Sequence, residues 1–332
     1  MIYLETNCTN PYFNLAFEEW VLTHFTKDEY LILWQNENSV IIGQNQNTLE
    51  EIDPVFVKEH KINVVRRTTG GGAVYHDLGN LNYSFITDYD RQRGTDMSIF
   101  TDMVVKALTD LGLPAEKSGR NDILVDGKKV SGTAQRVVKV DGKERILYHG
   151  TLLFRSDPEM IAGALRPDPL KFSSKATKSV RSRVGNISDY MPEGTTLDDF
   201  WKAILRRLDG HTDFFLIDRI NFDEIIKLQI EKYLTYEWNY GKSPLFRYTS
   251  KQHFAGGTVD VRLNIEKGVI TEASIFGDFL SLKPASEIAG ALCGVRYDEK
   301  DIRAVLSVFE IGDYMGQITK EELLSVITGM QE

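Results

Sequence analysis

The sequence contains few cysteines and no long apolar run. Only Cys8 and Cys293 occur among its 332 residues, and two cysteines so far apart indicate neither a metal site nor a disulfide framework. No apolar run approaches the roughly 20 residues that cross a bilayer. The first residues also lack the basic region followed by an apolar one that marks an export signal. We therefore expect a cytoplasmic protein without a membrane partner.

Positive charge is scarce overall, but it is concentrated in one region. The chain carries a formal net charge of −9 and has a pI near 5.3. Between Lys117 and Arg183, however, fifteen basic residues stand against seven acidic ones, a local charge of +8. Such a region can attract an acidic protein domain or the phosphates of a nucleotide. The low pI and the absence of interleaved basic and aromatic residues argue against nucleic acid as the partner.

The most informative segment is Arg66-Arg67-Thr68-Thr69-Gly70-Gly71-Gly72-Ala73-Val74-Tyr75-His76-Asp77. The apolar residues before it predict a strand that ends at the glycines. Glycines accept positive φ and let main-chain N–H groups approach a phosphate. A glycine run alone is more often a plain turn, and this one matches neither the dinucleotide nor the Walker pattern. Adjacent arginines in a strand face opposite sides, so we expect Arg67, nearest the loop, to face a ligand.

A second group of residues surrounds an Asp-Gly turn. Asp126-Gly127 predicts a tight hairpin that places Lys128 and Lys129 at the start of the returning strand. Strand alternation sends the two side chains to opposite faces, so one lysine can enter a cleft while the other meets solvent. Two solvated lysines would be the ordinary interpretation of such a pair.

Six segments in a fixed order resemble the lipoate-protein ligase A family, within the biotin/lipoate protein ligase superfamily. The resemblance covers most of the first 190 residues, and the ordered set is far more specific than any one motif. The segments are Asn14-Leu15-Ala16-Phe17-Glu18-Glu19, the arginine-glycine segment, Gly119-Arg120-Asn121-Asp122, Lys129-Val130-Ser131-Gly132-Thr133-Ala134, Tyr148-His149-Gly150-Thr151-Leu152-Leu153 and Ser179-Val180-Arg181-Ser182-Arg183-Val184.

The resemblance implies an ATP-dependent ligase. The carboxylate of lipoic acid would attack the α-phosphate of ATP, giving lipoyl-adenylate and pyrophosphate. A lysine of a lipoyl carrier domain, in a 2-oxoacid dehydrogenase E2 subunit or the glycine cleavage H protein, would then take the acyl group as an amide. Joining two anions requires cations and N–H dipoles fixed around the phosphoryl oxygens, and arginine, glycine amides and lysine meet that need.

The resemblance also assigns roles to single residues. It implies that Lys129 contacts both the lipoyl carbonyl and the phosphate, acting by electrostatic stabilisation. Asp122 is expected to hold Mg²⁺, with Asn80 and Asn121 as supporting polar groups; Asn80 could equally cap a turn. The nucleotide-binding residues are expected to be Arg67, Gly70, Gly71, Gly72, Ala73, Val74, Tyr75, Asn80, Asp122 and Lys129. The expected walls of an apolar lipoyl slot are Leu15, Ala16, Trp34, His76 and His149. For Trp34 a place in the core is the simpler interpretation.

Other functions remain open at this point. Octanoyl and lipoyl transferases of the same superfamily use a thioester on a cysteine, and neither Cys8 nor Cys293 lies in a glycine or lysine motif. A biotin-type or octanoate-preferring ligase would share the adenylation chemistry. A protein that binds carriers without adenylation activity is the third alternative, and the presence of both the glycine loop and Lys129 argues against it.

The order of predicted helices and strands is irregular and favours an α+β fold. The resemblance implies a mixed-sheet biotin/lipoate ligase catalytic domain, related to class II tRNA synthetases, with a small α+β C-terminal accessory domain. We expect the catalytic domain over residues 1–240, a hinge over 241–250 and the accessory domain over 251–332. Residues 171–183, rich in Ser, Lys and Thr, are expected to form an exposed loop that could close over the site.

Local patterns predict the elements. The first helix should begin after Asn10 or Asn14. Strands are expected near 122–125, 129–138 and 144–154, the last two joined by the Asp141-Gly142 turn, and in the second domain over 257–265 and 269–276. Helices are expected over 97–111, 196–208 and 221–235 and after Ser286, Asp298 and Thr319.

Overall fold

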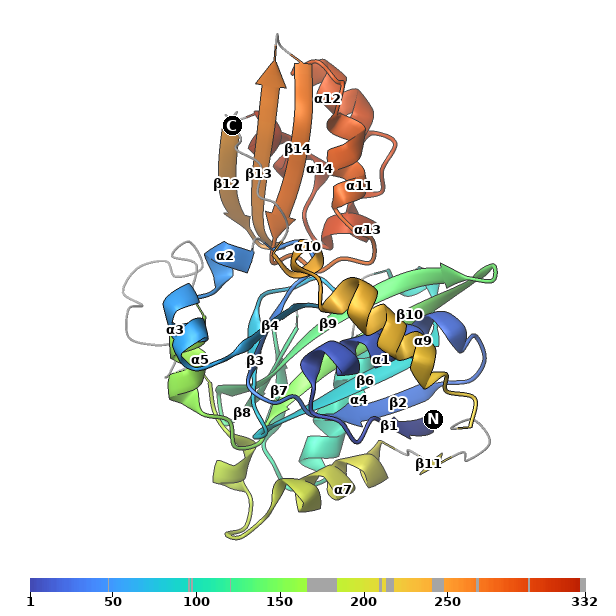
Figure 1. Cartoon of the computed structure of the whole chain (residues 1–332), viewed down its shortest axis with the longest axis vertical. Coiled ribbons are helices and arrows are strands. Elements are labelled where there is room, and N and C mark those ends of the chain that lie inside the picture. Colours follow the sequence, from blue (N-terminus) through green and yellow to red (C-terminus); the bar gives the residue numbers. More distant parts are fainter. Residues whose placement is uncertain are drawn as a thin grey trace.

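The computed structural model has a large α+β part that contains the N-terminus and a smaller α+β part that contains the end of the chain (Figure 1). It describes residues 1–328 except 47, 95, 97, 120, 166–183, 209–210, 213–217, 241–247, 267–268 and 298. None of the helices in these ranges combines the length and the apolar character needed to cross a membrane. The expected α+β class with a mixed sheet and a small second part is confirmed.

An eight-stranded mixed sheet forms the centre of the large part, in the order β11-β1-β2-β6-β10-β9-β8-β7. Its strands are β1 (Ile2–Glu5), β2 (Tyr30–Trp34), β6 (Asn80–Asp88), β7 (Ala115–Ser118), β8 (Asp122–Val125), β9 (Lys128–Val140), β10 (Lys143–Leu153) and β11 (His211–Thr212). β1 runs parallel to β2 and β11, and every other neighbouring pair is antiparallel.

Two Asp-Gly turns build the antiparallel half of this sheet, as predicted. Asp126 and Gly127 have φ of 51° and 74°, and Asp141 and Gly142 have φ of 48° and 81°. Positive φ at both central residues is the geometry of the tight hairpin turn that Asp-Gly favours. The first turn connects β8 to β9 and thereby delivers Lys128 and Lys129 to the first positions of β9.

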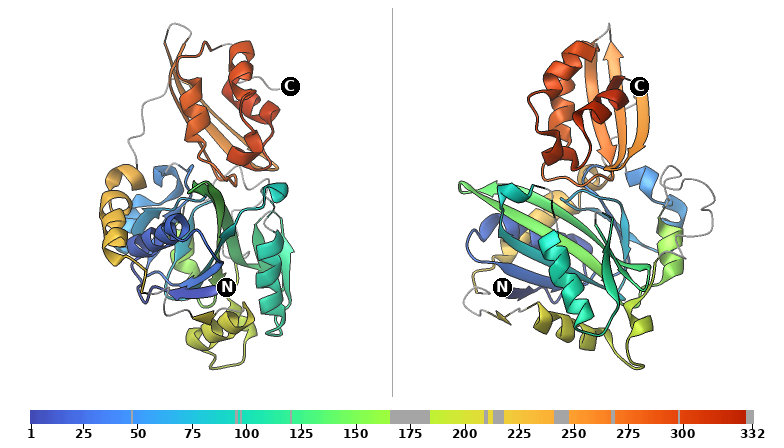
Figure 2. Two further views of the ribbon diagram at one scale, coloured as in Figure 1. Left: turned by 90° about the vertical axis from the view of Figure 1, so that its right-hand side faces the viewer. Right: turned by 180° about the vertical axis from the view of Figure 1, so that it is seen from behind.

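Helices cover both faces of the main sheet (Figure 2). α1 (Pro11–His24) begins after Asn10, whose side-chain oxygen accepts the N–H groups of Tyr12 and Phe13; such a cap satisfies donors of the first turn. Asn14 lies inside this helix. α4 (Ser98–Thr109) and α7 (Leu197–Arg207) pack on the opposite face, where α7 begins with a capping box formed by Thr196 and Asp199.

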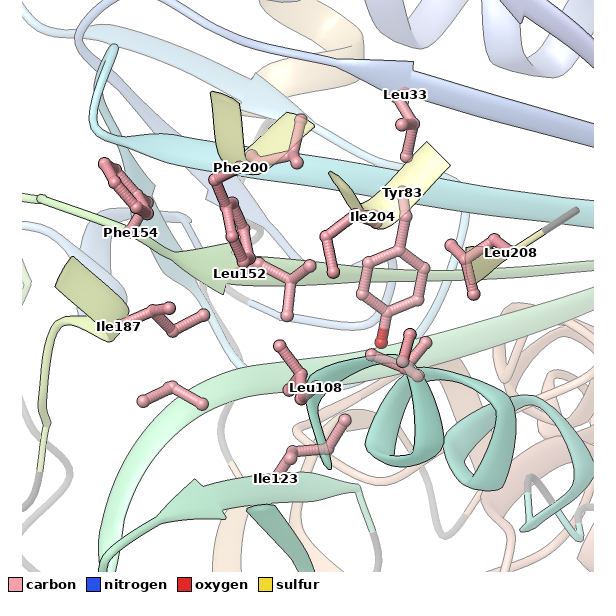
Figure 3. Packing of buried hydrophobic residues seen from close by; sticks show 14 of the residues in the cluster. Leu33, Tyr83, Leu108, Ile123, Leu152, Phe154, Ile187, Phe200, Ile204 and Leu208 are labelled. Atoms are coloured by element: carbon pink, nitrogen blue, oxygen red, sulfur yellow. The ribbon is translucent and has the colours of Figure 1, made fainter. Parts of the chain in front are cut away.

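The side chains of β6 alternate strictly between the two faces of the main sheet. Leu81, Tyr83 and Phe85 enter the core beneath α4 and α7, part of which Figure 3 shows around Tyr83, Leu152 and Phe200. The alternate residues Asn80, Asn82 and Ser84 are fully buried on the other face. Because that face lies toward α1, the polar residues of β6 occupy the side of the sheet on which the other sequence motifs gather.

A second, three-stranded sheet lies beside the main one. It consists of β3 (Ser39–Ile42), β4 (Asn63–Arg66) and β5 (Val74–His76), with β3 in the centre. The connection from β4 to β5 is the glycine loop. Three short helices complete this region: α2 (Thr48–Glu51), α3 (Pro54–Glu59) and α5 (Pro158–Ala164).

The smaller part has its own apolar core. Its antiparallel strands are β12 (Tyr248–Phe254), β13 (Gly257–Glu266) and β14 (Val269–Gly277). Its helices α11 (Ser286–Leu292), α12 (Glu299–Leu306), α13 (Ile311–Met315) and α14 (Lys320–Thr328) lie on one face of that sheet (Figures 1 and 2). The buried residues of this core all come from within 259–327.

A segment between the two parts departs from a plain helix. The helix expected over 221–235 is α9 (Phe222–Leu228) followed by a π-helical turn, η4 (Gln229–Tyr233), and then α10 (Tyr236–Asn239). Two short 3-10 helices, η1 (Arg91–Arg93) and η3 (Ile187–Tyr190), occur elsewhere. The expected loop over 171–183 and most of the expected hinge lie outside the described residues.

Candidate active site

One cavity contains residues from most of the motifs. It lies between the glycine loop, the start of β9, helix α1 and the polar face of β6 and β10. Its walls are formed by Leu15, Trp34, Ile41, Arg67, Gly71, Gly72, Ala73, Val74, His76, Asn82, Asn121, Lys129, Gly132, Thr133, Ala134, His149, Gly150 and Thr151. The walls are thus apolar and glycine-rich, with a few polar groups and one lysine, as expected for a small-molecule site.

The glycine loop is held against neighbouring backbone. Gly71 has φ of 88°, a conformation that disfavours any side chain. A Cβ on Gly43 would lie 2.0 Å from the Gly71 carbonyl oxygen, so the end of β3 touches the loop directly. The Gly71 N–H donates to the Phe279 carbonyl of the smaller part at 3.1 Å. Glycine is therefore required at Gly71 for its φ and at Gly43, just after β3, for the close approach to the loop.

The two adjacent arginines point in opposite directions. The Arg66 guanidinium is buried and donates to the carbonyls of Gly43, Gln46 and Trp238 at 2.7–3.0 Å. It thereby connects the turn after β3 to helix α10. No acidic residue accepts from it in the hydrogen bonds of the described chain, and burial lowers its pKa to about 10.

Arg67 lines the cavity, and its donors hold the glycine loop. Its Nε donates to Thr69 Oγ1 at 2.9 Å, and its Nη2 donates to the carbonyls of Gly70 and Gly72 at 2.6 and 2.9 Å. Burial lowers its pKa to about 10, so it stays positive at neutral pH. Arg67 both shapes the loop and places positive charge beside it.

Lys129 enters the cavity at the β8–β9 hairpin. Its Nζ lies 2.7 Å from a carboxylate oxygen of Asp122, while Lys128 is exposed on the other face. The β8–β9 register shifts between Ile123 and Leu124, an irregularity beside this pair. About a third of each side chain is exposed, so the ion pair adds little to stability. It positions an ammonium group where a ligand can reach it.

A buried chain of hydrogen bonds connects α1 to the glycine loop. The Glu18 carboxylate lies 2.8 Å from His149 Nδ1 and accepts from Ser84 Oγ at 2.5 Å. His149 Nε2 contacts Thr69 Oγ1 at 2.8 Å, and Thr69 accepts from Arg67. This chain fixes the orientation of His149, which lines the cavity, and couples it to the arginine that holds the loop.

His76 is neutral in this site. Burial lowers its pKa to about 3, and the positive charge of Arg67 and the proximity of His149 act in the same direction. Its ring meets the Trp34 ring edge to face at a centroid distance of 6.3 Å. Trp34 is buried in the core beneath α1 and also lines the cavity, while its Nε1 donates to Ser84 Oγ at 2.9 Å.

The structure brings most of the expected site residues together. The expected residues that do not line the cavity are Gly70, Tyr75, Asn80, Asp122 and Ala16. Tyr75 packs beneath the small sheet, Ala16 belongs to the core under α1, Asn80 donates to Asn82, and Asp122 lies behind Lys129 as its ion-pair partner. The sequence argument assigned no role to Asn82, Thr151, Thr133 and Glu18, although the last three lie in the segments quoted above. The alternation of polar and apolar residues over 80–85 was the available signal for Asn82.

The residues fit a magnesium ion only in part. Asp122 supplies one carboxylate, but no group of three or more His, Cys, Asp or Glu side chains suited to a metal occurs in the described ranges. Mg²⁺ commonly binds through one or two carboxylates together with substrate phosphates. The donor set thus suits an ion that arrives with ATP, held by Asp122 and the phosphates. Neither free cysteine lines the cavity.

Family comparison places the chain among ligases. The model of the lipoyl protein ligase A/B catalytic domain matches residues 10–209, and that of the bacterial lipoate protein ligase C-terminus matches residues 243–327. The chain belongs to the lipoate-protein ligase family. It is 41% identical to lipoate-protein ligase LplJ of Bacillus subtilis (strain 168) over 334 residues, which cover 98% of this chain and 100% of the relative.

Solved structures agree with this assignment. A bi-partite lipoate protein ligase from Thermoplasma acidophilum, solved in a study that includes its E2 lipoyl domain, is 30% identical with a TM-score of 0.61, covering 74% of this chain and 98% of that one. A lipoate-protein ligase A bound with ATP is also 30% identical, with a TM-score of 0.58 and coverage of 72% and 97%.

Proposed function

We propose that this cavity is where the ligase joins lipoate to AMP and then passes the lipoyl group to a carrier lysine. The observation that carries the proposal is the position of Lys129, whose ammonium group lies in the same cavity as the glycine loop and an apolar wall. Its Nζ can contact a carboxylate and a phosphate together. The ATP-bound relative supports the nucleotide, and the name of the Bacillus subtilis relative supports lipoate.

In the first step, a lipoate carboxylate oxygen attacks the α-phosphorus of ATP and pyrophosphate leaves. Arg67 supplies positive charge beside the glycine loop, where the phosphoryl oxygens would lie, while Lys129 neutralises charge on the acyl and phosphate oxygens. Bound Mg²⁺ would neutralise charge on the triphosphate. In the second step the neutral amine of a carrier lysine attacks the acyl carbon, AMP leaves, and the amine loses a proton as the amide forms.

The carrier in this proposal is a lipoyl domain, from an E2 subunit or from the glycine cleavage H protein. The study of the archaeal ligase with its E2 lipoyl domain supports this class of partner. We assign the catalytic domain to residues 1–240, a hinge to 241–250 and the accessory domain to 251–332. The separate core within 259–327 and the family match over 243–327 support that division.

The two neighbouring lysines allow a matched test. Lys129→Ala and Lys128→Ala remove the same group from opposite faces of β9. Removing a charge stabiliser of the transition state costs about 10²–10³ in rate, so Lys129→Ala should slow lipoyl-AMP formation and carrier modification by that factor, and Lys128→Ala should change them little. Product is measured as lipoyl-AMP by chromatography and as the intact mass of the carrier. Near-normal rates in Lys129→Ala would remove Lys129 from the mechanism.

A thioester route is the second candidate, and the structure gives it no support. Both free cysteines lie outside the cavity wall, whereas a covalent acyl intermediate requires a nucleophile beside the bound acid. Replacing Cys8 and Cys293 by serine together should therefore leave lipoylation intact. Loss of all transfer in that folded variant would favour the transferase.

A further inference from the structure

Two buried N–H groups in the cavity wall have no hydrogen-bond partner in the described part of the chain. They are Nε2 of His76 and Nδ2 of Asn82, and the two side chains are only 3% and 1% exposed. Both residues line the cavity. A buried donor without a partner is costly and rare in folded proteins. Two of them in one cavity indicate a ligand group that accepts from both.

Hydrogen bonds of the Asn14 and Asn36 side-chain amides determine which ring nitrogen of His76 carries the proton. Asn14 Nδ2 donates to the carbonyls of Cys8 and Gln35 at 2.9 and 2.7 Å, which can only accept. Asn36 Oδ1 lies 3.0 Å from the same Nδ2, which has only two protons and therefore shares them among three acceptors. An Asn36 nitrogen turned toward Asn14 would find no acceptor there, so the Asn36 amide nitrogen is the atom 3.1 Å from His76 Nδ1 and donates to it. Neutral histidine carries one ring proton. It therefore lies on Nε2, the ring nitrogen that has no partner in the described part of the chain.

Asn82 is oriented by its neighbour on the same face of β6. Asn80 Nδ2 donates to Asn82 Oδ1 at 2.9 Å, which occupies the acceptor of the Asn82 amide. The Asn82 Nδ2 group is thereby left as the part of this side chain that a ligand can meet. Asn82 is paired with Trp34 on β2 and with Thr151 on β10, so it lies between two other residues of the cavity wall.

Asn82 lies far from the reacting end, and His76 packs against the ring of Trp34, the residue paired with Asn82. Thr151 Oγ1 accepts from the Gly132 N–H at 3.1 Å, and Gly132 lies beside Lys129 Nζ. A line from Lys129 on β9 across β10 thus reaches Asn82 on β6 and Trp34 on β2. Strands are about 4.8 Å apart, so Asn82 is roughly 10 Å from β9. An extended chain of eight carbons, with bonds of about 1.5 Å, covers a similar distance.

The end of the acid that reaches Asn82 is therefore its tail. In lipoate the tail carries a ring with two sulfur atoms, which are soft, weak acceptors. In octanoate, an acid of the same number of carbons, the tail has no acceptor at all. A carboxylate would be drawn to Lys129 and the glycine loop rather than to two neutral donors, because charge-assisted contacts are stronger.

We propose that His76 Nε2–H and Asn82 Nδ2–H recognise the sulfur atoms of the dithiolane ring and so select lipoate over octanoate. This assignment rests on the proposed function, because it takes the cavity to be the lipoate site. Asn14 and Asn36 are positioning residues, because their hydrogen bonds keep the His76 proton on Nε2, where the dithiolane ring can accept it. When octanoate is bound, both N–H groups stay buried without an acceptor. This cost lowers the affinity for octanoate relative to that for lipoate.

The test compares lipoate with octanoate in wild type and in Asn82→Leu, a variant with the same branching at Cγ and no N–H group. The kcat/KM for acid-dependent ATP–pyrophosphate exchange is measured for each acid. The ratio of lipoate to octanoate should fall about tenfold in Asn82→Leu, through a loss with lipoate and a gain or no change with octanoate. Asn38→Leu, an exposed asparagine before β3, is the matched control and should keep the wild-type ratio.

A second measurement is made on the wild-type protein, so its result does not depend on the activity of any variant. In the ¹⁵N spectrum of the wild-type protein, the Asn82 side-chain amide and the His76 Nε2–H are identified by substitution and followed during titration. Both signals should move more with lipoate than with octanoate. Equal shifts, or an unchanged ratio in Asn82→Leu, would overturn the inference while exchange activity stands. Absence of exchange with either acid in the wild type would instead refute the proposed function.

Discussion

Gly43 tests whether the end of β3 sets the position of the glycine loop. Its N–H donates to Gln46 Oε1 at 2.8 Å and its carbonyl accepts from Arg66 Nη1 at 2.8 Å. An added Cβ would lie 2.0 Å from the carbonyl oxygen of Gly71. Gly43 does not have a positive φ, so Gly43→Ala acts by packing, mainly against the Gly71 peptide and more weakly against Gln46 Oε1 at 3.1 Å.

The size of the effect follows from the distance. Cβ atoms do not approach other heavy atoms within 3.0 Å, so the Gly71 peptide must move by at least 1 Å. Overpacking of this kind costs about 1–3 kcal/mol of stability, which leaves a folded protein. A displacement of about 1 Å in a positioned group can reduce the rate 10²-fold. We therefore expect kcat/KM for lipoate-dependent pyrophosphate exchange to fall about a hundredfold in Gly43→Ala.

Gly290→Ala is the matched control, because it adds the same methyl group in α11 with no atom within 4 Å. It should leave exchange unchanged and stabilise the helix by about 0.5–1 kcal/mol. Both variants are compared by exchange kinetics, with circular dichroism to verify folding. A Gly43→Ala enzyme within about threefold of wild type would show that the loop tolerates the shift and would refute this reasoning.

Two further predictions concern the buried ionisable groups. Arg66→Met should lower the free energy of unfolding in urea by about 2–4 kcal/mol, because the carbonyls of Gln46 and Trp238 lose the arginine as donor; a loss below about 1 kcal/mol would contradict the role of Arg66 as the connection to α10. Burial lowers the pKa of His76 to about 3 from an ordinary value near 6.5, so below pH 6.5 the unfolded chain binds a proton that the folded chain does not. Stability should therefore rise with pH by up to about 1.4 kcal/mol per unit between pH 3 and 6.5 and level off above. Urea titrations of wild type and His76→Phe should show a shallower slope in the variant, and equal slopes would be evidence against a buried neutral His76.

Local patterns predicted the parts of the fold that local chemistry determines. Asp-Gly at 126–127 and 141–142 fixes hairpins because both residues must accept positive φ. Asn10 begins α1 because its side chain satisfies first-turn donors. Asn14 was an equal candidate from sequence, and its buried contacts with two loop carbonyls determine its place within the helix. The π-helical turn η4 likewise depends on distant packing of Tyr233 and Lys232 against Glu19.

The motifs predicted which residues share the candidate site, but the hydrogen bonds among them could not be predicted from the sequence. The motifs brought Arg67, His149 and Lys129 to one cavity, as the family resemblance implied. Which face of β6 lies toward the ligand depends on pairing with β2 and β10, and those strands are distant in sequence. The contact of the Gly71 N–H with Phe279 joins segments about 200 residues apart in the chain. No local pattern encodes such contacts, because they arise only when separate elements pack together.

The central claim is that this chain activates lipoate as an adenylate before any carrier is present. The most direct test is ATP–pyrophosphate exchange with the purified protein, Mg²⁺ and lipoate, with no lipoyl domain added. Reversible adenylate formation predicts exchange that depends on lipoate and is lost in Lys129→Ala. Absence of exchange from folded protein, together with transfer from a preformed acyl donor to a carrier domain, would contradict the claim and identify an acyl transferase.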